Sequence, residues 1–185
     1  MSKVIAGMTM SLDGYVNDES GSVDGLYTDF TELHKAPAFQ EMIKTTGAVV
    51  MGRHVYEMAD PFSWANETYE FQTPIFVLTH KPPAKYPEGN GKLSFTFVTD
   101  GIETAISMAL KAANGKDVQV IGANTIQQCL NVGLCDELQI DIMPVLLGCG
   151  LKLFENIDTN KIKLERTKIE EPTPTRTSMI FRVIR

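Results

Sequence analysis

Cysteine, long apolar runs and basic residues are all scarce in this chain. Its three cysteines, Cys129, Cys135 and Cys149, lack CxxC spacing, which argues against a disulfide framework and against a zinc knuckle. No apolar run approaches the roughly 20 residues that cross a bilayer. The short apolar stretch after Lys3 is interrupted by Asp13 before a secretory signal could be complete. We therefore expect a cytoplasmic protein with no membrane association.

Acidic residues outnumber basic ones, and the formal net charge is -6. Proteins that bind nucleic acids usually carry a basic face, so this balance argues against such a partner. His34, His54 and His80 lie far apart and belong to no metal-ligand motif, so no metal site is expected. A phosphorylated small molecule could still bind in a local basic pocket, because global charge does not decide that point.

The chain of 185 residues is long enough for one domain with a substantial core, and we expect a single domain over residues 1–185. Strand-like and helix-like segments alternate, and the C-terminal part is rich in strands. Strands are expected at 3–10, 48–51, 74–79, 93–98, 117–121, 136–143, 162–169 and 178–184. Helices are expected at 37–45, 54–59, 102–113 (with Asp100 as N-cap) and 124–132, and loops at 17–29, 61–72 and 82–92. This pattern predicts an α/β fold with a mostly parallel central sheet, an antiparallel C-terminal edge and helices on both faces.

The segment GAVVMGRHVYE (47–57) is the most informative stretch of the chain. Its apolar residues do not alternate with polar ones, as expected of a strand that is covered on both faces. Gly52 allows a tight turn into a helix, whose first N–H groups and dipole favour an anion, and Arg53 adds a positive charge. A plain strand-to-helix connection with a surface arginine fits the same residues, so this segment alone does not distinguish an anion-binding corner from a structural turn.

A second glycine corner, IGANT, follows the strand at 117–121. In an open α/β sheet ligands lie at the carboxyl ends of the strands, so both corners could face one crevice and share the phosphates of a dinucleotide. A small-residue turn that lets the next helix pack closely is the alternative for Gly122. At the end of a third strand, His80 and Lys81 could meet a phosphate, or could simply be solvated.

The order of these segments resembles the dihydrofolate reductase fold. The segments are SLDG, MGRHVYE, VLTHK and IGANTI, each at the end of an expected strand, and VVMGRHVYE is close to the cofactor motif of that superfamily. The later segment GLCDELQIDIMPVLLGCGLKLF resembles the reductase domain of the riboflavin-biosynthesis deaminase-reductases and their stand-alone relatives. The resemblance covers nearly the whole chain. It implies an NADPH-dependent oxidoreductase, and it implies a homodimer that pairs through its C-terminal sheet region.

The resemblance also implies where the cofactor and a small-molecule substrate would bind. Cofactor-binding residues are expected in three groups at strand ends: Gly52, Arg53 and His54; Leu78, Thr79, His80 and Lys81; and Gly122, Ala123, Asn124 and Thr125. Arg53 and Lys81 together suit the 2′-phosphate of NADPH, which needs cationic partners that NAD does not. The substrate side would be lined by Ala6, Met8, Ser11, Leu12, Trp64 and the loop to Asp29.

The chain departs from its relatives at the substrate side. Dihydrofolate reductases carry an acidic residue near the start of the helix before MGR, where this chain has Ala36, Pro37 and Ala38. The riboflavin-pathway reductases usually have a basic residue after SLDG and an acidic one before the second glycine corner, where this chain has Tyr15 and Ile121. These departures argue against folate reduction and against binding of a phosphoribosyl substrate, and they leave the identity of the substrate open. The resemblance implies a reductase of a small pyrimidine-like or pterin-like heterocycle, related to 5-amino-6-(5-phosphoribosylamino)uracil reductase.

Two residues of the substrate side have competing interpretations. Asp13 could donate a proton near a reduced C=N or C=O bond, or could simply be a turn residue. Trp64 could stack on a flat substrate, or could pack against the protein body or a partner subunit. The main hypothesis is an NADPH-dependent reductase with Asp13 as its catalytic residue. The alternatives are an NADP-binding protein of the same fold without turnover, and a scaffold that uses the fold for association alone.

Overall fold

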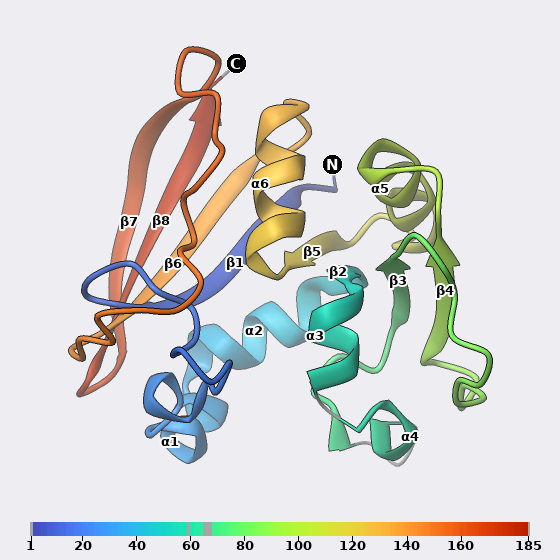
Figure 1. The fold of residues 1–185 in the computed structure, drawn as a ribbon, viewed down its shortest axis with the longest axis horizontal. Helices are drawn as coiled ribbons and strands as arrows, with labels where there is room; N and C mark the ends of the chain where they lie inside the picture. Colours follow the sequence, from blue (N-terminus) through green and yellow to red (C-terminus); the bar gives the residue numbers. More distant parts are fainter. Residues whose placement is uncertain (1, 59, 65–67, 185) are drawn as a thin grey trace.

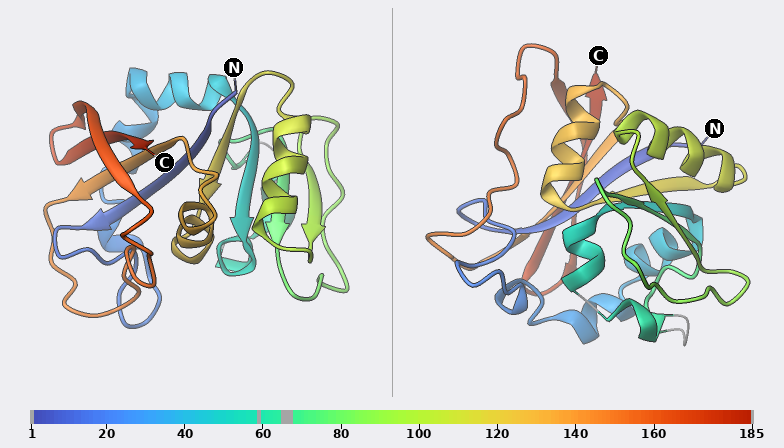
Figure 2. Two further views of the ribbon diagram at one scale, coloured as in Figure 1. Left: turned by 90° about the horizontal axis from the view of Figure 1, so that it is seen from above. Right: turned by 45° about the vertical axis from the view of Figure 1, so that its right-hand side comes forward.

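The computed structural model describes residues 2–58, 60–64 and 68–184, and its strands form one sheet (Figure 1). The strands in chain order are β1 (Val4–Ser11), β2 (Thr46–Gly52), β3 (Pro74–Leu78), β4 (Ser94–Val98), β5 (Asp117–Ile121), β6 (Glu137–Met143), β7 (Lys163–Thr173) and β8 (Arg176–Ile184). Their order in the sheet is β4-β3-β2-β5-β1-β6-β8-β7. The further views show β4 at one edge and the β7–β8 hairpin at the opposite edge (Figure 2).

Neighbouring strands from β4 to β6 run parallel, and the last two strands run antiparallel. β8 pairs with β6 and with β7 in antiparallel register, whereas β1 pairs in parallel with both β5 and β6. Parallel neighbours need a crossover connection, whereas antiparallel neighbours can be joined by a short turn. The short turn between Thr173 and Arg176 joins β7 to β8 in this way. The predicted mostly parallel sheet with an antiparallel C-terminal edge is confirmed.

Helices cover both faces of the sheet, as predicted. They are α1 (Phe30–Lys35), α2 (Pro37–Thr45), α3 (Arg53–Met58), α4 (Pro61–Ser63), α5 (Ile102–Ala112) and α6 (Ala123–Asn131), with a 3-10 turn η1 (Asp24–Leu26). The two faces of β2 belong to different cores. Ala48 and Val50 pack in the cluster with α5 and α6, whereas Val49 and Met51 pack with Tyr56 of α3. This double burial explains why the strand is apolar without alternation.

Three local expectations differ from the structure. The helix α1 falls just after the predicted loop 17–29 and was not expected. The N-cap of α5 is Gly101, at φ 93°, and not Asp100. The positive φ is readily adopted by glycine, and it displaces the expected acidic cap by one residue. The helix expected at 54–59 begins at Arg53, and its expected end at Ala59 lies outside the described residues.

No helix in the described part of the chain is long and apolar enough to cross a membrane. The cytoplasmic location stays a prediction.

Candidate functional site

A cavity opens where the sheet splits between β1 and β5. These two strands are paired only from Val4 to Ala6, and the pairing stops at Ala6 and Val120. β1 continues to Ser11 paired with β6 alone, so the backbone beyond Gly7 has no strand neighbour on the β5 side. The chain leaves β1 toward β2 and leaves β5 toward β6, and ligands bind at such a divergence in open α/β sheets.

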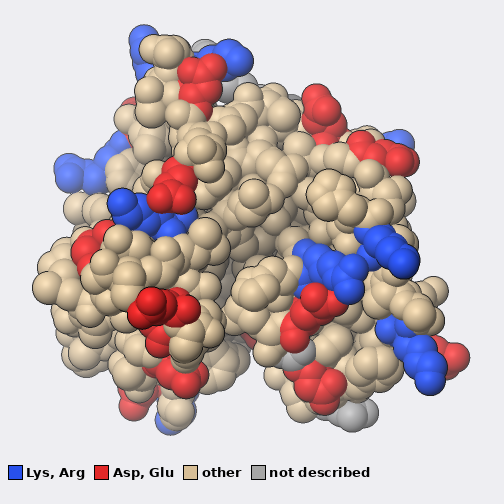
Figure 3. All heavy atoms as spheres, viewed as in Figure 1, with Lys and Arg blue, Asp and Glu red and all other residues tan. Residues whose placement is uncertain are grey.

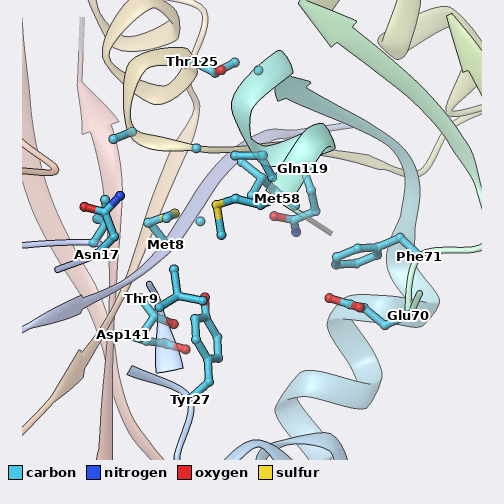
Figure 4. A pocket seen from close by; sticks show the side chains of 18 of the residues that line it. Met8, Thr9, Asn17, Tyr27, Met58, Glu70, Phe71, Gln119, Thr125 and Asp141 are labelled. Atoms are coloured by element: carbon cyan, nitrogen blue, oxygen red, sulfur yellow. The ribbon is translucent and has the colours of Figure 1, made fainter. Parts of the chain in front are cut away.

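The cavity has a volume of about 560 Å³, within the range of sites for small molecules and cofactors. In the space-filling view it is approached through a groove between the lobe with α1 and the lobe with α3 and α4 (Figure 3). Its described lining includes the two glycine corners, the middle of β1, β5 and β6, and an apolar and aromatic wall (Figure 4).

The two glycine corners meet at one end of this cavity. A side chain at Gly122 would place its Cβ 2.8 Å from Val55 Cγ2, and one at Gly52 would place its Cβ 2.9 Å from Thr125 Oγ1. Gly122 also has φ 97° and is the N-cap of α6, where no side chain caps the helix. The corner therefore leaves the first N–H groups of α6 available beside the cavity, which Ala123, Asn124 and Thr125 line.

Arg53 and Lys81 are brought together next to these corners. Arg53 Nη1 donates a hydrogen bond to the backbone oxygen of Lys81 at 2.9 Å, which links the end of β2 to the end of β3. Arg53 Nε also pairs with Glu57 at 2.7 Å, and both side chains remain partly exposed. The hydroxyl of Thr79 donates to the same Lys81 oxygen at 3.0 Å. Basic side chains lie beside the groove on the α3 side (Figure 3).

The predicted cofactor residues therefore divide into two groups. Gly52, His54 and the residues from Gly122 to Thr125 line the cavity. Arg53 and the segment from Leu78 to Lys81 lie outside its lining, at the adjacent corner where the ends of β2 and β3 meet. The structure thus brings all three predicted segments together where the strands have their carboxyl ends, and Arg53 and Lys81 lie beyond the glycine corners.

A buried ion-pair network lies behind the opposite end of the cavity. Arg176, whose side chain is 0% exposed, forms a double interaction with Asp29, through Nε at 3.1 Å and Nη2 at 2.7 Å. Its Nη1 donates to Thr9 Oγ1 at 2.7 Å and to Asp141 Oδ2 at 3.3 Å. The guanidinium also lies over the ring of Tyr27, 5.5 Å from the centroid. Thr9, Tyr27 and Asp141 line the cavity, so this network forms its floor.

The carboxyl groups at this end have different electrostatic environments. Burial works to raise the pKa of Asp29, but hydrogen bonds from Arg176 and Thr173 outweigh it and lower that pKa. Burial raises the pKa of Asp141 despite the opposing effects of Ser178 and Arg176. Burial also raises the pKa of Glu70, which lines the other side of the cavity. Asp141 Oδ1 is buried without a hydrogen-bond partner among the described residues.

Trp64 forms part of an aromatic wall. Its ring stacks on Tyr69 with centroids 4.2 Å apart and planes inclined by 15°, and it meets Tyr56 edge-on at 6.0 Å. Trp64, Tyr69 and Phe71 all line the cavity. The side chain of Trp64 thus packs against the protein body, as one of the two interpretations held, and also faces the proposed substrate region. Residues 65–67 of the expected aromatic loop lie outside the described residues.

Asp13 is not among the residues that line the cavity, and its role as proton donor stays a prediction. Its carboxylate accepts hydrogen bonds from Ser11 Oγ at 2.6 Å and from the backbone N–H groups of Leu147 and Gly148 at 3.1 and 2.7 Å. The Ser11 hydroxyl, together with these backbone N–H groups, lowers the pKa of Asp13 to about 2. An ionised carboxylate with three donors anchors the loop after β6, and is poorly suited to release a proton.

Other predicted substrate residues also lie outside the cavity lining. Ala6 is fully buried in the core with α5 and α6, Ser11 is fully buried beside Asp13, and Leu12 is 65% exposed. Met8 does line the cavity, as expected of the substrate side. Asn17 and Tyr27, from the expected loop to Asp29, also line the cavity. The residues that sequence reasoning missed are Thr9, Met58, Glu70, Phe71, Gln119, Gln139, Asp141 and, behind the floor, Arg176. An available signal was the pattern of β5 and β6, where polar residues, including Gln119 and Asp141, alternate with apolar ones.

This sheet order is that of the dihydrofolate-reductase-like fold. Dihydrofolate reductase from Enterococcus faecalis, solved with NADP(H), superposes with a TM-score of 0.58 at 15% identity, covering 99% of this chain and 97% of that one. The match at this low identity shows the shared fold alone. Both the fold and the resemblance predicted from the segment order are confirmed.

The chain belongs to the RibD C-terminal domain family, whose sequence model matches residues 2–175. A structure from Shewanella sp. PV-4, provisionally assigned to riboflavin biosynthesis, is 25% identical with a TM-score of 0.73 and 99% coverage of both chains. The protein YwjB of Bacillus subtilis, which has no assigned activity, is 27% identical over 172 residues, 90% of this chain and 91% of its own. The family and its neighbours support a reductase of the riboflavin-pathway type.

Proposed function

We propose that this chain is an NADPH-dependent reductase of a small heterocyclic substrate. The observation that carries the proposal is the joint position of the two glycine corners at one end of a cavity whose other end has buried carboxyl groups. One end suits the phosphates of a dinucleotide and the other suits a polar ring. Membership of the RibD C-terminal domain family supports the same class of reaction.

The residues at the cofactor end fit a dinucleotide. Gly122 must lack a side chain because its Cβ would lie 2.8 Å from Val55 Cγ2, so a pyrophosphate at this corner would meet backbone N–H groups. The N–H groups at the start of α6 would donate to its oxygens, and Arg53 with Lys81 would meet the 2′-phosphate. NADPH, when bound, supplies the hydride, and the protein supplies binding and orientation.

Reduction of a C=N or C=O bond also consumes a proton. Asp141 is the better candidate for its source than Asp13, because its carboxyl group lies at the cavity floor and burial raises its pKa. Arg176 would keep this carboxyl group oriented by its contact with Oδ2.

The test is a pair of arginine variants in NADPH and NADH titrations, followed by the change in cofactor fluorescence. Arg53→Ala removes one charge-assisted contact, so NADPH binding should weaken by roughly 1.5–3 kcal/mol, about 10- to 150-fold, while NADH binding changes little. Arg182→Ala is the matched control, because Arg182 is an exposed arginine paired with Glu165 at 3.1 Å on the far hairpin. Equal NADPH affinity in the wild type and in Arg53→Ala would contradict the phosphate assignment.

Binding without turnover is the second candidate function. It is favoured by the position of Asp13, because the residue expected to be catalytic is engaged with the backbone of Leu147 and Gly148. Saturable NADPH binding with no cofactor oxidation across pterins, pyrimidines and quinones would select it over the reductase.

We also propose that the chain forms a homodimer through the β7–β8 hairpin. Leu164, Ile169 and Ile184 of this hairpin are large apolar residues that are 41–50% exposed. β7 is also an edge strand, which favours coverage by another chain. Sedimentation velocity should show a dimer in the wild type and a monomer in Ile169→Lys, whereas a monomeric wild type would refute the proposal.

A further inference from the structure

Arg176 is the buried cation behind the cavity floor, and all its hydrogen-bond donors are already used. A guanidinium has five N–H groups. Besides the contacts with Asp29, Thr9 and Asp141, Nη2 donates to the backbone oxygen of Leu26 at 3.0 Å. Five N–H groups therefore meet five acceptors, and the side chain is 0% exposed. Arg176 cannot serve as the partner of an anionic substrate without breaking this network.

The described lining of the cavity contains two carboxylic acids, Glu70 and Asp141, and neither a lysine nor an arginine. The two acids face the cavity from opposite sides, with the side chains of Met8 and Met58 near its middle (Figure 4). His54 belongs to the glycine corner, at the cofactor end. Because Asp29 and Asp141 share the one charge of Arg176, the substrate end carries more carboxyl groups than cationic side chains among the described residues.

Apart from the polar side chains of Thr9, Asn17, Gln119 and Gln139, the described lining is largely apolar and aromatic. Trp64, Tyr69 and Phe71 form one wall, and the methionines have flexible side chains that adapt to a planar ring. A phosphate placed here would lose its hydration near two carboxyl groups with no free cation to compensate. A ring that carries N–H groups, or a positive charge, would instead satisfy the carboxyl oxygens.

We infer that the substrate end binds an unphosphorylated planar heterocycle, neutral or cationic, whose N–H groups donate to Asp141 and Glu70. This inference rests on the proposed function, because it assigns the glycine corners to the cofactor. It separates the chain from any reductase whose substrate carries a phosphoribosyl group. The specificity arises because Asp29 and Asp141 share the single positive charge of Arg176, and no lysine or arginine of the described lining compensates Glu70.

Three pyrimidines of similar size and different charge test this inference. Calorimetric titrations with NADPH present at saturation would compare 2,4-diaminopyrimidine, which has N–H donors and a basic ring, with neutral uracil and with anionic orotate. We expect the dissociation constants to increase in that order, with at least a tenfold difference between the first and the last. Orotate binding as tightly as 2,4-diaminopyrimidine, or no saturable binding of any of the three, would overturn the inference.

Side-chain variants locate the effect. In Asp141→Asn the amide oxygen must accept the hydrogen bond from Arg176 Nη1. The NH₂ group, which can only donate, then stands where a carboxyl oxygen would accept from the ring N–H. Binding of 2,4-diaminopyrimidine should therefore weaken at least tenfold, and Glu70→Gln should weaken it less. Glu137→Gln is the matched control, since Glu137 lies on the same strand but pairs with Lys3 at the surface. An unchanged affinity in both Asp141→Asn and Glu70→Gln would refute the assignment.

NADPH affinity separates this inference from the proposed function. It is measured first for each variant, and it should stay within about twofold of the wild type because neither acid lies at the glycine corners. If NADPH does not bind the wild type, the proposed function fails. If NADPH binds but the order of the three pyrimidines is reversed, the proposed function stands and only the inference fails.

Discussion

Replacement of Arg176 by methionine should destabilise the protein more than any exposed ion pair could. The side chain is 0% exposed, and its main partner Asp29 is only 7% exposed. Removal of one partner from a buried pair leaves a charge without compensation, which costs about 3–5 kcal/mol. Methionine fills a similar length of the site without any donor, so Asp29, Thr9 and the Leu26 carbonyl would all lose a hydrogen bond.

Urea denaturation of the wild type and Arg176→Met, followed by circular dichroism, measures this loss as a difference in the free energy of unfolding. Arg182→Met is the control, because its partner Glu165 is 52% exposed and such pairs contribute about 0–1 kcal/mol. A loss below about 1 kcal/mol for Arg176→Met would mean that the Arg176–Asp29 pair contributes no more than an exposed ion pair, and would refute this prediction. The double variant Arg176→Met with Asp29→Leu should recover part of the loss, since the buried carboxylate of Asp29 is then no longer left without its partner.

The pH dependence of the same measurement has a defined sign. The pKa of Asp29 is lower in the folded protein than in the unfolded chain, where it is about 3.9. Its contribution to stability is therefore fully present above that value, and it is lost as the pH falls through the folded pKa. Wild-type stability should decrease in acid below about pH 4, and Arg176→Met should lose much of this dependence. Parallel curves for the two proteins would contradict the assignment of the low pKa to this pair.

Three further outcomes are expected. Gly122→Val should abolish NADPH binding in fluorescence titrations, because its side chain would meet Val55 at 2.8 Å and the backbone has φ 97°; an unchanged affinity would exclude the corner from the cofactor site. Glu70→Gln should raise the free energy of unfolding more at pH 8 than at pH 4. Burial raises the pKa of Glu70, so the ionised carboxylate destabilises the folded protein above the pKa of the unfolded chain; urea denaturation at pH 4 and pH 8 measures the difference. Asp13→Asn should speed amide hydrogen exchange at Leu147 and Gly148 while NADPH affinity stays constant, whereas a loss of turnover alone would restore a catalytic role to Asp13.

Helices and strands could be predicted where the local residue pattern matches the way the segment is buried in the fold. The unalternating apolar run of β2 matches its burial on both faces, and Pro37 marks the first residue of α2. The helix α1 was missed because it has little local signal of its own. Within the helix His34 packs on Phe30 at 4.2 Å between ring centroids, and it also packs on Phe39 of the neighbouring α2 at 4.9 Å, which holds α1 in place.

The site could be predicted at its cofactor end and only in part at its substrate end. The glycine corners are local, because the same few residues end a strand and begin a helix. The function of Asp13 depends on Leu147 and Gly148, which lie 134 and 135 residues further along the chain. The pairing of Arg176 with Asp29 spans 147 residues, and no pattern around either residue indicates the other.

The missing carboxylate at Ala36, Pro37 and Ala38 shows why an absent motif residue is weak grounds for excluding a chemistry. These three residues at the start of the helix cannot supply an acid. The structure nevertheless supplies Asp141 from β6 and Glu70 from the segment before β3 to the same cavity. A carboxyl group acts through its position and environment, and any element that reaches the cavity can carry it. The absence at one position therefore predicts a different substrate geometry rather than a cavity without an acid.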